Sequence, residues 1–149
     1  MREAHMKPDA HQFLAELAKA YNKRDRAALF SFFALDDPRF CMFEEFSGEL
    51  LHAWNYAQIL STVGEATGSM SFEVLDSRRY GEYLLVHAIQ RIEEQTGRRE
   101  NEEAVIRVTL FVSMREGAPR ILSGHFSSMM LCFPKRETVI RWSRMGEGA

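Results

Sequence analysis

Apolar residues recur at helical spacing near the start of the chain. Phe13, Leu17 and Tyr21 lie four residues apart, and charged residues fall between them on the opposite face. This pattern is typical of an amphipathic helix. Asp9, with Gln12 three residues later, has the form of a capping box. We therefore predict a first helix that begins after Asp9.

Two further helices and one short strand are expected before residue 64. Asp25 is a suitable N-cap for a second, shorter helix, which ends near Pro38 because the residue before a proline resists the helical region. Residues 40–46 alternate imperfectly between apolar and polar side chains, which indicates a short strand. Apolar residues at helical spacing predict a third helix over residues 49–63, which a following glycine would end.

From Met70 onward the helical period disappears and strand patterns replace it. We predict two strands joined near residues 79–82, a long polar hairpin loop over residues 93–103, and two further strands over residues 105–114 and 121–130. Helices grouped ahead of strands predict an α+β domain, in which the three helices lie on one face of a curved antiparallel sheet.

The strand over residues 105–114 has two distinct faces. Its even-numbered positions are uniformly apolar, whereas Arg107 and Thr109 fall on the odd-numbered face. Because successive strand residues point to opposite faces, the even positions are expected to be buried. Arg107 then lines either a wetter pocket wall, where its guanidinium would bind a carboxylate, or the outer, dimer-facing side of the sheet.

Composition narrows the function classes. The chain has 149 residues and a formal net charge of −2. It therefore lacks the excess of basic residues that is typical of nucleic-acid-binding proteins. No apolar stretch approaches the roughly 20 residues of a membrane helix. The N-terminus has no apolar signal region, and Cys41 and Cys132 are isolated. A single cytoplasmic domain is therefore expected, with two buried thiols rather than a disulfide.

Two segments of the chain resemble SnoaL-like proteins of the nuclear transport factor 2-like superfamily. The segment RVTLFVSMREGAPRILSGHFS (residues 107–127) is similar to their closing strands, and FLAELAKAYNKRDRAALFSFFALDDPRF (residues 13–40) is similar to their opening helices. Gly48 lies where these proteins have a glycine before the third helix. Pro119 and Ser123 depart from the pattern, because the family usually has tryptophan and histidine there.

This resemblance implies a cone, in which a strongly bent sheet wraps round the helices and encloses an apolar pocket. It also implies a homodimer that forms through the sheet. Family members include ketosteroid isomerases, polyketide cyclases, dehydratases, transport factors and kinase hub domains, so the fold alone gives little information on function.

The ketosteroid isomerase mechanism does not fit this sequence. That enzyme uses an Asp base, with a Tyr and a protonated Asp as oxyanion hole. By the resemblance, the tyrosine falls on Leu17, the base on Met42, and the second acid near Thr109 or Phe111. None of these side chains is able to perform the corresponding step.

Glu44 and His125 are the candidate catalytic residues. Glu44 follows Met42 on the same face of the first strand, where a carboxylate among apolar neighbours suits general acid–base chemistry. Solvation beside Glu45 at the pocket mouth is the alternative. His125 and His87 lie on predicted strands, where each either contacts a ligand or pairs with Glu44, or is satisfied by the backbone. The histidines show no metal-binding spacing, so neither a metal nor another cofactor is expected.

Other pocket residues are expected on the helices and the first strand. The candidates share an apolar body, in some cases with a polar tip, and core packing explains them equally well: Tyr21, Phe40, Met42, Trp54 and Tyr56. His87 and Arg107 complete the set.

The sequence therefore predicts a bacterial-type, homodimeric pocket protein. Its ligand would be a small organic molecule, and its chemistry a cofactor-independent isomerisation, cyclisation or dehydration with Glu44 as base and His125 as donor. A protein-interaction domain with a vestigial pocket is the alternative. Residues 1–134 form the predicted domain, and residues 135–149 a tail that docks on it or on the dimer partner through Val139, Ile140 and Trp142.

Overall fold

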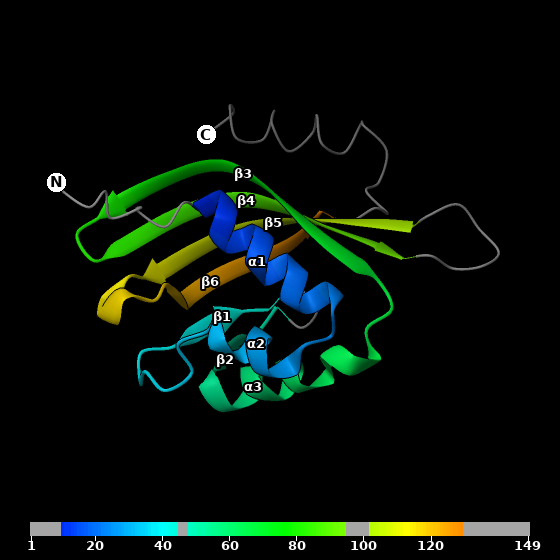
Figure 1. Cartoon of the computed structure of the whole chain (residues 1–149), viewed down its shortest axis with the longest axis horizontal. Helices are drawn as coiled ribbons and strands as arrows, with labels where there is room; N and C mark the ends of the chain where they lie inside the picture. The colour runs from blue at the N-terminus through cyan, green and yellow to red at the C-terminus, as the bar shows by residue number, and fades with distance from the viewer. Residues whose placement is uncertain (1–9, 45–47, 95–101, 130–149) are drawn as a thin grey trace, which may run out of the picture.

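The first helical stripe forms α1 (Ala10–Asn22) in the computed structural model, which describes residues 10–44, 48–94 and 102–129. Phe13, Leu14 and Leu17 are buried on one side of this helix, as the spacing predicts. Figure 1 shows α1 crossing the sheet, where it packs on β3 (Ser69–Tyr80).

The second helix, α2 (Arg26–Ser31), begins where its capping residue predicts. Asp25 has an extended backbone, and its side chain accepts a hydrogen bond of 3.1 Å from the backbone N–H of Ala28. Such a bond satisfies one of the amide donors that a helix leaves unpaired at its first turn. The prediction of a second helix with Asp25 as its N-cap is confirmed.

The region after α2 contains one more strand than the sequence predicts. Residues 41–43 form β1 (Cys41–Phe43), and the start of the predicted third helix is instead β2 (Leu50–His52), which pairs antiparallel with β1. The helix α3 (Ala53–Ser61) follows directly and ends in the 3₁₀ turn η1 (Thr62–Glu65). The predicted start of this helix was therefore wrong by about one turn.

Four long strands make up most of the sheet: β3, β4 (Tyr83–Glu94), β5 (Glu102–Ser113) and β6 (Arg120–Met129). A short 3₁₀ turn, η2 (Arg115–Gly117), connects β5 with β6. The strand order is β2-β1-β6-β5-β4-β3. All neighbouring strands are antiparallel except β1 and β6, which are parallel, so the expectation of an antiparallel sheet holds for four of its five pairings.

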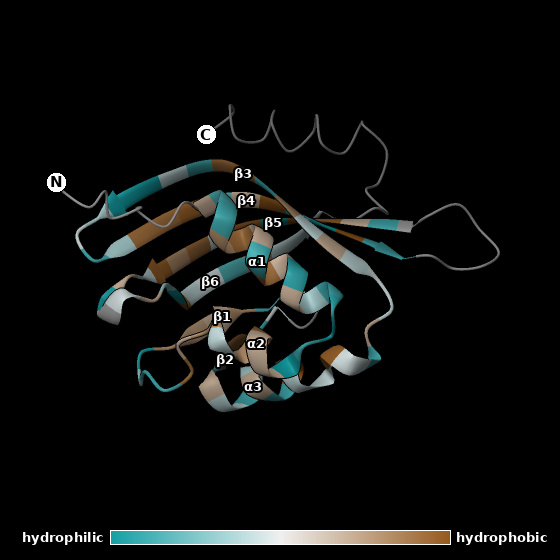
Figure 2. Ribbon diagram, in the orientation of Figure 1, coloured by the Kyte–Doolittle hydropathy of each residue, from teal (hydrophilic) through white to brown (hydrophobic). Residues whose placement is uncertain are grey.

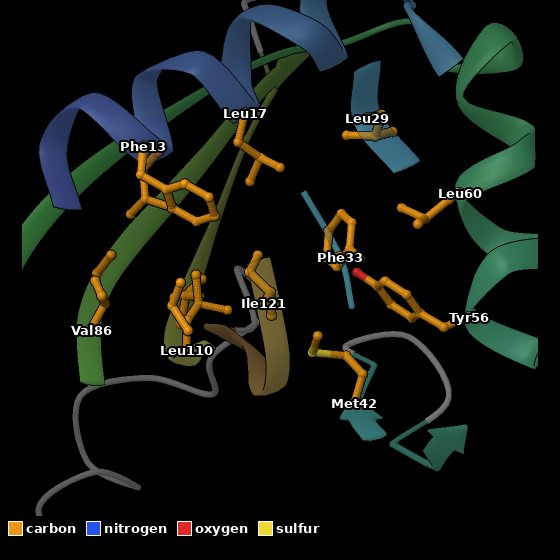
Figure 3. Packing of buried hydrophobic residues seen from close by; sticks show 14 of the residues in the cluster. Phe13, Leu17, Leu29, Phe33, Met42, Tyr56, Leu60, Val86, Leu110 and Ile121 are labelled. Atoms are coloured by element: carbon orange, nitrogen blue, oxygen red, sulfur yellow. The ribbon is translucent and has the colours of Figure 1, made fainter. Parts of the chain in front are cut away.

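The sheet separates a buried inner face from an exposed outer face. The even positions of β5 are inward, and Val108, Leu110 and Val112 are each at most 3% exposed. In Figure 2 the hydrophobic strands β4 and β5 lie in the middle of the sheet. Figure 3 shows Phe13 and Leu17 projecting from α1 toward the inner face. The sheet curves round the helices without closing, as the fold prediction requires.

No helix among the described residues has the length and apolar character needed to cross a membrane. The predicted tail (residues 135–149), Cys132 and the proposed Asp9 cap lie outside the described residues.

Candidate functional site

A cavity of about 570 Å³ lies between the helices and one end of the inner sheet face. This volume falls within the range of roughly 300–1,000 Å³ that is usual for small-molecule sites. Its walls are mainly apolar and come from α1, α2, α3 and the long strands, and they include Leu17, Leu29, Phe33, Leu60, Ile106 and Phe126. The structure therefore contains a largely apolar cavity where the resemblance implies a pocket.

Gln90 is a buried polar side chain in this apolar wall. It lies on β4 between the inward residues Ala88 and Ile92, lines the cavity, and is only 5% exposed. Its Nε2 donates a hydrogen bond of 3.2 Å to the sulfur of Met70, which also lines the cavity. A thioether is a weak acceptor, so this contact leaves much of the amide's hydrogen-bonding capacity for whatever occupies the cavity.

Glu44 lines the same cavity from the end of β1. It is 8% exposed and follows Met42 by two residues, which places it on the inner side of the strand. The backbone N–H of Glu44 donates to the carbonyl of Glu49, and its carbonyl accepts from the N–H of Gly48. These two bonds hold the chain in position where it turns toward β2. The structure therefore shows Glu44 buried, and not solvated at the pocket mouth.

Two of the tyrosines named as pocket candidates also belong to the lining. Tyr56 projects from α3 toward Phe33 (Figure 3). Its ring centroid lies 5.2 Å from that of Phe33 and 5.5 Å from that of Phe40. Tyr21 lies on the last turn of α1, and the guanidinium of Arg24 sits 4.9 Å from its ring centroid. Both tyrosines line the cavity.

The mouth of the cavity is acidic. Glu65 from η1, Glu94 from β4 and Glu103 from β5 contribute to its lining. Glu65 and Glu94 are exposed, and Glu94 belongs to the inward row of β4 that also holds Gln90. Glu103 instead forms an ion pair with Arg91, with Nε and Oε1 3.4 Å apart. Glu65 and Glu94 are thus exposed carboxylates of the lining that form no ion pair with another described residue.

The predicted histidine and arginine contacts lie on the other side of the sheet. His125 on β6, Thr109 on β5 and His87 on β4 are register neighbours in one row of the outer face. Nδ1 of His87 is 3.1 Å from the Thr109 hydroxyl, and the ring of His125 packs against Phe43 with centroids 5.2 Å apart. Arg107 lies on the same face and is exposed.

This arrangement corrects one part of the prediction. A contact between Glu44 and either His125 or His87 is excluded, because the sheet separates Glu44 from both histidines. The same geometry decides between the two alternatives for Arg107, which occupies the outer side rather than a pocket wall.

Three other candidates are also absent from the cavity lining. Phe40 and Met42 are at most 1% exposed and belong to the packed core. Trp54 is 76% exposed on α3 and points away from the interior, because the helix buries Tyr56 and Leu60 instead. Their assignment to the pocket was wrong, and core packing explains Phe40 and Met42.

Sequence reasoning missed Gln90, Glu65 and Glu94, although a signal for two of them existed. Gln90 and Glu94 share the even parity of the buried residues Val86 and Ala88. A polar residue within such a row is the sign of a functional position on an inner sheet face. For Glu65 the sequence gives no signal, since the 3₁₀ turn determines its direction.

A metal site is not formed by the described residues, where no three His, Cys, Asp or Glu side chains gather closely enough. The cavity offers carboxylates, a carboxamide, hydroxyls and apolar walls. Such a set is suited to binding an organic molecule by shape, hydrogen bonds and charge.

Comparison with known proteins identifies the fold. Neither a protein-family model nor a curated protein matches the chain. Among solved structures, an NTF-2 like protein of unknown function from Shewanella oneidensis has a TM-score of 0.62 at 16% identity, with 78% of this chain and 93% of that chain covered.

Two more solved structures share the arrangement. A domain of unknown function with a cystatin-like fold from Nostoc punctiforme has a TM-score of 0.60 at 14% identity, covering 93% of this chain and 84% of that one. The CaMKII hub of S. rosetta has a TM-score of 0.60 at 16% identity, covering 78% and 92%. The chain therefore has the nuclear transport factor 2-like, or cystatin-like, cone fold.

Proposed function

We propose that this protein binds a small organic molecule with a largely apolar body in the cavity between its helices and sheet. The observation that carries the proposal is the buried Gln90 side chain in the wall of a cavity of about 570 Å³. A buried amide costs stability unless it is hydrogen-bonded, and a ligand or a bound water supplies the missing partner. Glu44 and Tyr56 add further polar side chains to the lining of the same cavity.

Native mass spectrometry of freshly purified protein tests this proposal. The wild-type chain should carry a defined extra mass that denaturation and solvent extraction remove. Ala104 lines the cavity, so Ala104→Trp should fill it and abolish the extra mass. Ala27 is exposed on α2, so Ala27→Trp makes the same change without touching the cavity and should retain the mass.

Two results would contradict ligand binding. One is an extra mass that persists in Ala104→Trp at the wild-type level, since the molecule would then sit elsewhere. The other is a wild-type protein that carries no extra mass and that takes up no compound from a fragment library.

Within the superfamily, we place the chain among the SnoaL-like proteins. The support is the sequence similarity of residues 13–40 and 107–127, at the two ends of the fold. If the cavity is catalytic, Glu44 is the proton acceptor, and its position in an apolar wall supports that role. Glu44→Gln should then abolish turnover, whereas unchanged turnover would remove the assignment.

Self-association through the outer sheet face is a second candidate function. This face carries apolar side chains that are only half-buried, such as Leu85, Ile89 and Phe111, and Phe43 is 42% exposed. Ile89→Glu should convert a dimer to a monomer in sedimentation velocity. Gln58→Glu, on the exposed side of α3, introduces the same charge away from the sheet and should not. A monomeric wild-type protein would contradict this function.

A further inference from the structure

The charged groups around the cavity all have the same sign. Glu44, Glu65, Glu94 and Glu103 contribute to its lining, whereas no Lys, Arg or His of the described residues does. Arg91 pairs with Glu103. Glu65 and Glu94 form no ion pair with another described residue, so the charges that the described part of the chain places at the mouth are negative. A cleft lined by one sign of charge concentrates ligands of the opposite sign.

The buried amide of Gln90 points independently to a ligand with hydrogen-bond donors. Its Nε2 donates to the Met70 sulfur, which leaves the side-chain carbonyl oxygen as the acceptor available inside the cavity. No donor to that oxygen is found among residues 10–44, 48–94 and 102–129. Gln90 is only 5% exposed, so leaving its side-chain oxygen without a hydrogen-bond donor lowers the stability of the folded protein. A donor on the bound molecule removes this penalty.

We propose that the cavity selects amines: small molecules with an apolar body and a group that is positively charged at neutral pH. This inference rests on the proposed function, because it requires the cavity to be a binding site. An ammonium group has only donors, so it satisfies the Gln90 oxygen, and its charge is opposite to that of the exposed carboxylates of Glu65 and Glu94. The apolar walls take up the rest of the molecule. A carboxylate ligand meets repulsion and finds no cation in the described lining.

Three probes with one apolar body test the inference: phenylbutylamine, phenylbutanol and phenylbutyrate. Their dissociation constants are measured by isothermal titration calorimetry at neutral pH and low salt. We expect the amine to bind at least about tenfold more tightly than the alcohol, and the carboxylate to bind most weakly. Added salt should reduce the preference for the amine, because the charges at the mouth are exposed and screened.

Adjacent residues on β4 provide matched variants. Glu94→Gln removes a charge from the inward row, whereas Glu93→Gln removes the same charge from the outward row. Glu94→Gln should lower the amine-to-alcohol affinity ratio at least about threefold, and Glu93→Gln should leave it unchanged. Glu93 and Glu94 are both exposed, so neither substitution disturbs the core and the comparison is decisive.

The outcomes separate the two proposals. If the alcohol or the carboxylate binds as tightly as the amine, or if Glu93→Gln and Glu94→Gln act alike, the charge inference is overturned while the cavity remains a binding site. If none of the three probes binds, the proposed function fails, and the inference fails with it.

Discussion

At the scale of single residues, Gly124 on β6 sits where no side chain fits. A Cβ there would lie 2.7 Å from the sulfur of Met42 and 2.9 Å from a methyl of Leu110, both of which are completely buried. Gly124→Ala should therefore overpack the core and lower the free energy of unfolding by about 1–3 kcal/mol in urea denaturation.

Gly64 is the matched control for this substitution. A Cβ at Gly64 would have no heavy atom within 4 Å, and its φ lies outside the left-handed region. Gly64→Ala should change the free energy of unfolding by less than about 1 kcal/mol. Equal effects of the two substitutions on the free energy of unfolding would contradict the close contact of Gly124 with Met42 and Leu110.

A second residue-scale prediction concerns Asp37, whose carboxylate accepts hydrogen bonds from the side chain and backbone of Arg39. These bonds lower the pKa of Asp37 from 3.8 to about 2. The ionised carboxylate therefore favours the folded state above its unfolded pKa, and this contribution is lost as the pH falls from 3.8 toward about 2.

Asp37→Asn should accordingly destabilise the protein at near-neutral pH, and the difference from wild type should shrink below about pH 3.8 and vanish once the pH falls below the folded pKa. Urea denaturation at a series of pH values checks this. Arg39→Met removes the same interaction and should show the same pH dependence. A difference between wild type and Asp37→Asn that stays constant down to about pH 2 would contradict the role assigned to this pair.

Individual residues also show which parts of the candidate site the sequence was able to predict. Alternation along β5 was enough to identify Val108 and Leu110 as buried, because side-chain direction in a strand depends only on parity. It did not place His125 on the outer face, since that requires knowing which residues of β6 pair with β5. The β5–β6 register contains an irregularity at residues 111–112, which no pattern in the sequence reveals.

At the scale of elements, the shortest helix depends most on its cap. The helix α2 has six residues, and Asp25 satisfies the N–H of Ala28 at its start. Asp25→Ala should lower the free energy of unfolding by about 0.5–2 kcal/mol, whereas Asp25→Asn should retain most of the stability because asparagine caps equally well. Thermal and urea denaturation measure both. Equal losses in the two variants would mean that the cap is not the stabilising feature.

Elements with a long, regular pattern were predicted well, whereas the three-residue strand β2 was missed. The helix α1 and the strands β3 to β6 each show a repeated hydrophobic period. The strand β2 has three residues, and its pairing partner β1 is equally short. Three residues cannot display a period, so Leu50 and Leu51 were assigned to the helix that follows. Only the pairing with β1 shows that they form a strand.

At the scale of the whole molecule, the cone results from a sheet with two different faces. Its inner face packs on the helices and leaves a cavity at one end, whereas its outer face carries the row that includes His125 and His87. The order of helices and strands, together with the resemblance at both ends of the chain, was sufficient to predict this architecture. The cavity wall could not be predicted in full, because residues as far apart in the chain as Glu65 and Gln90 line one cavity only through the curvature of the sheet.

The central claim is that a small molecule with an apolar body occupies this cavity. Titration of phenylbutylamine into ¹⁵N-labelled protein, followed by ¹H–¹⁵N correlation spectra, tests it most directly. The account predicts saturable shifts of the Gln90 side-chain amide and of the backbone amides of Ala104 and Ile106, with little change at His87 or Ser127 on the outer face. Unshifted Gln90 signals, or shifts confined to the outer face, would contradict it.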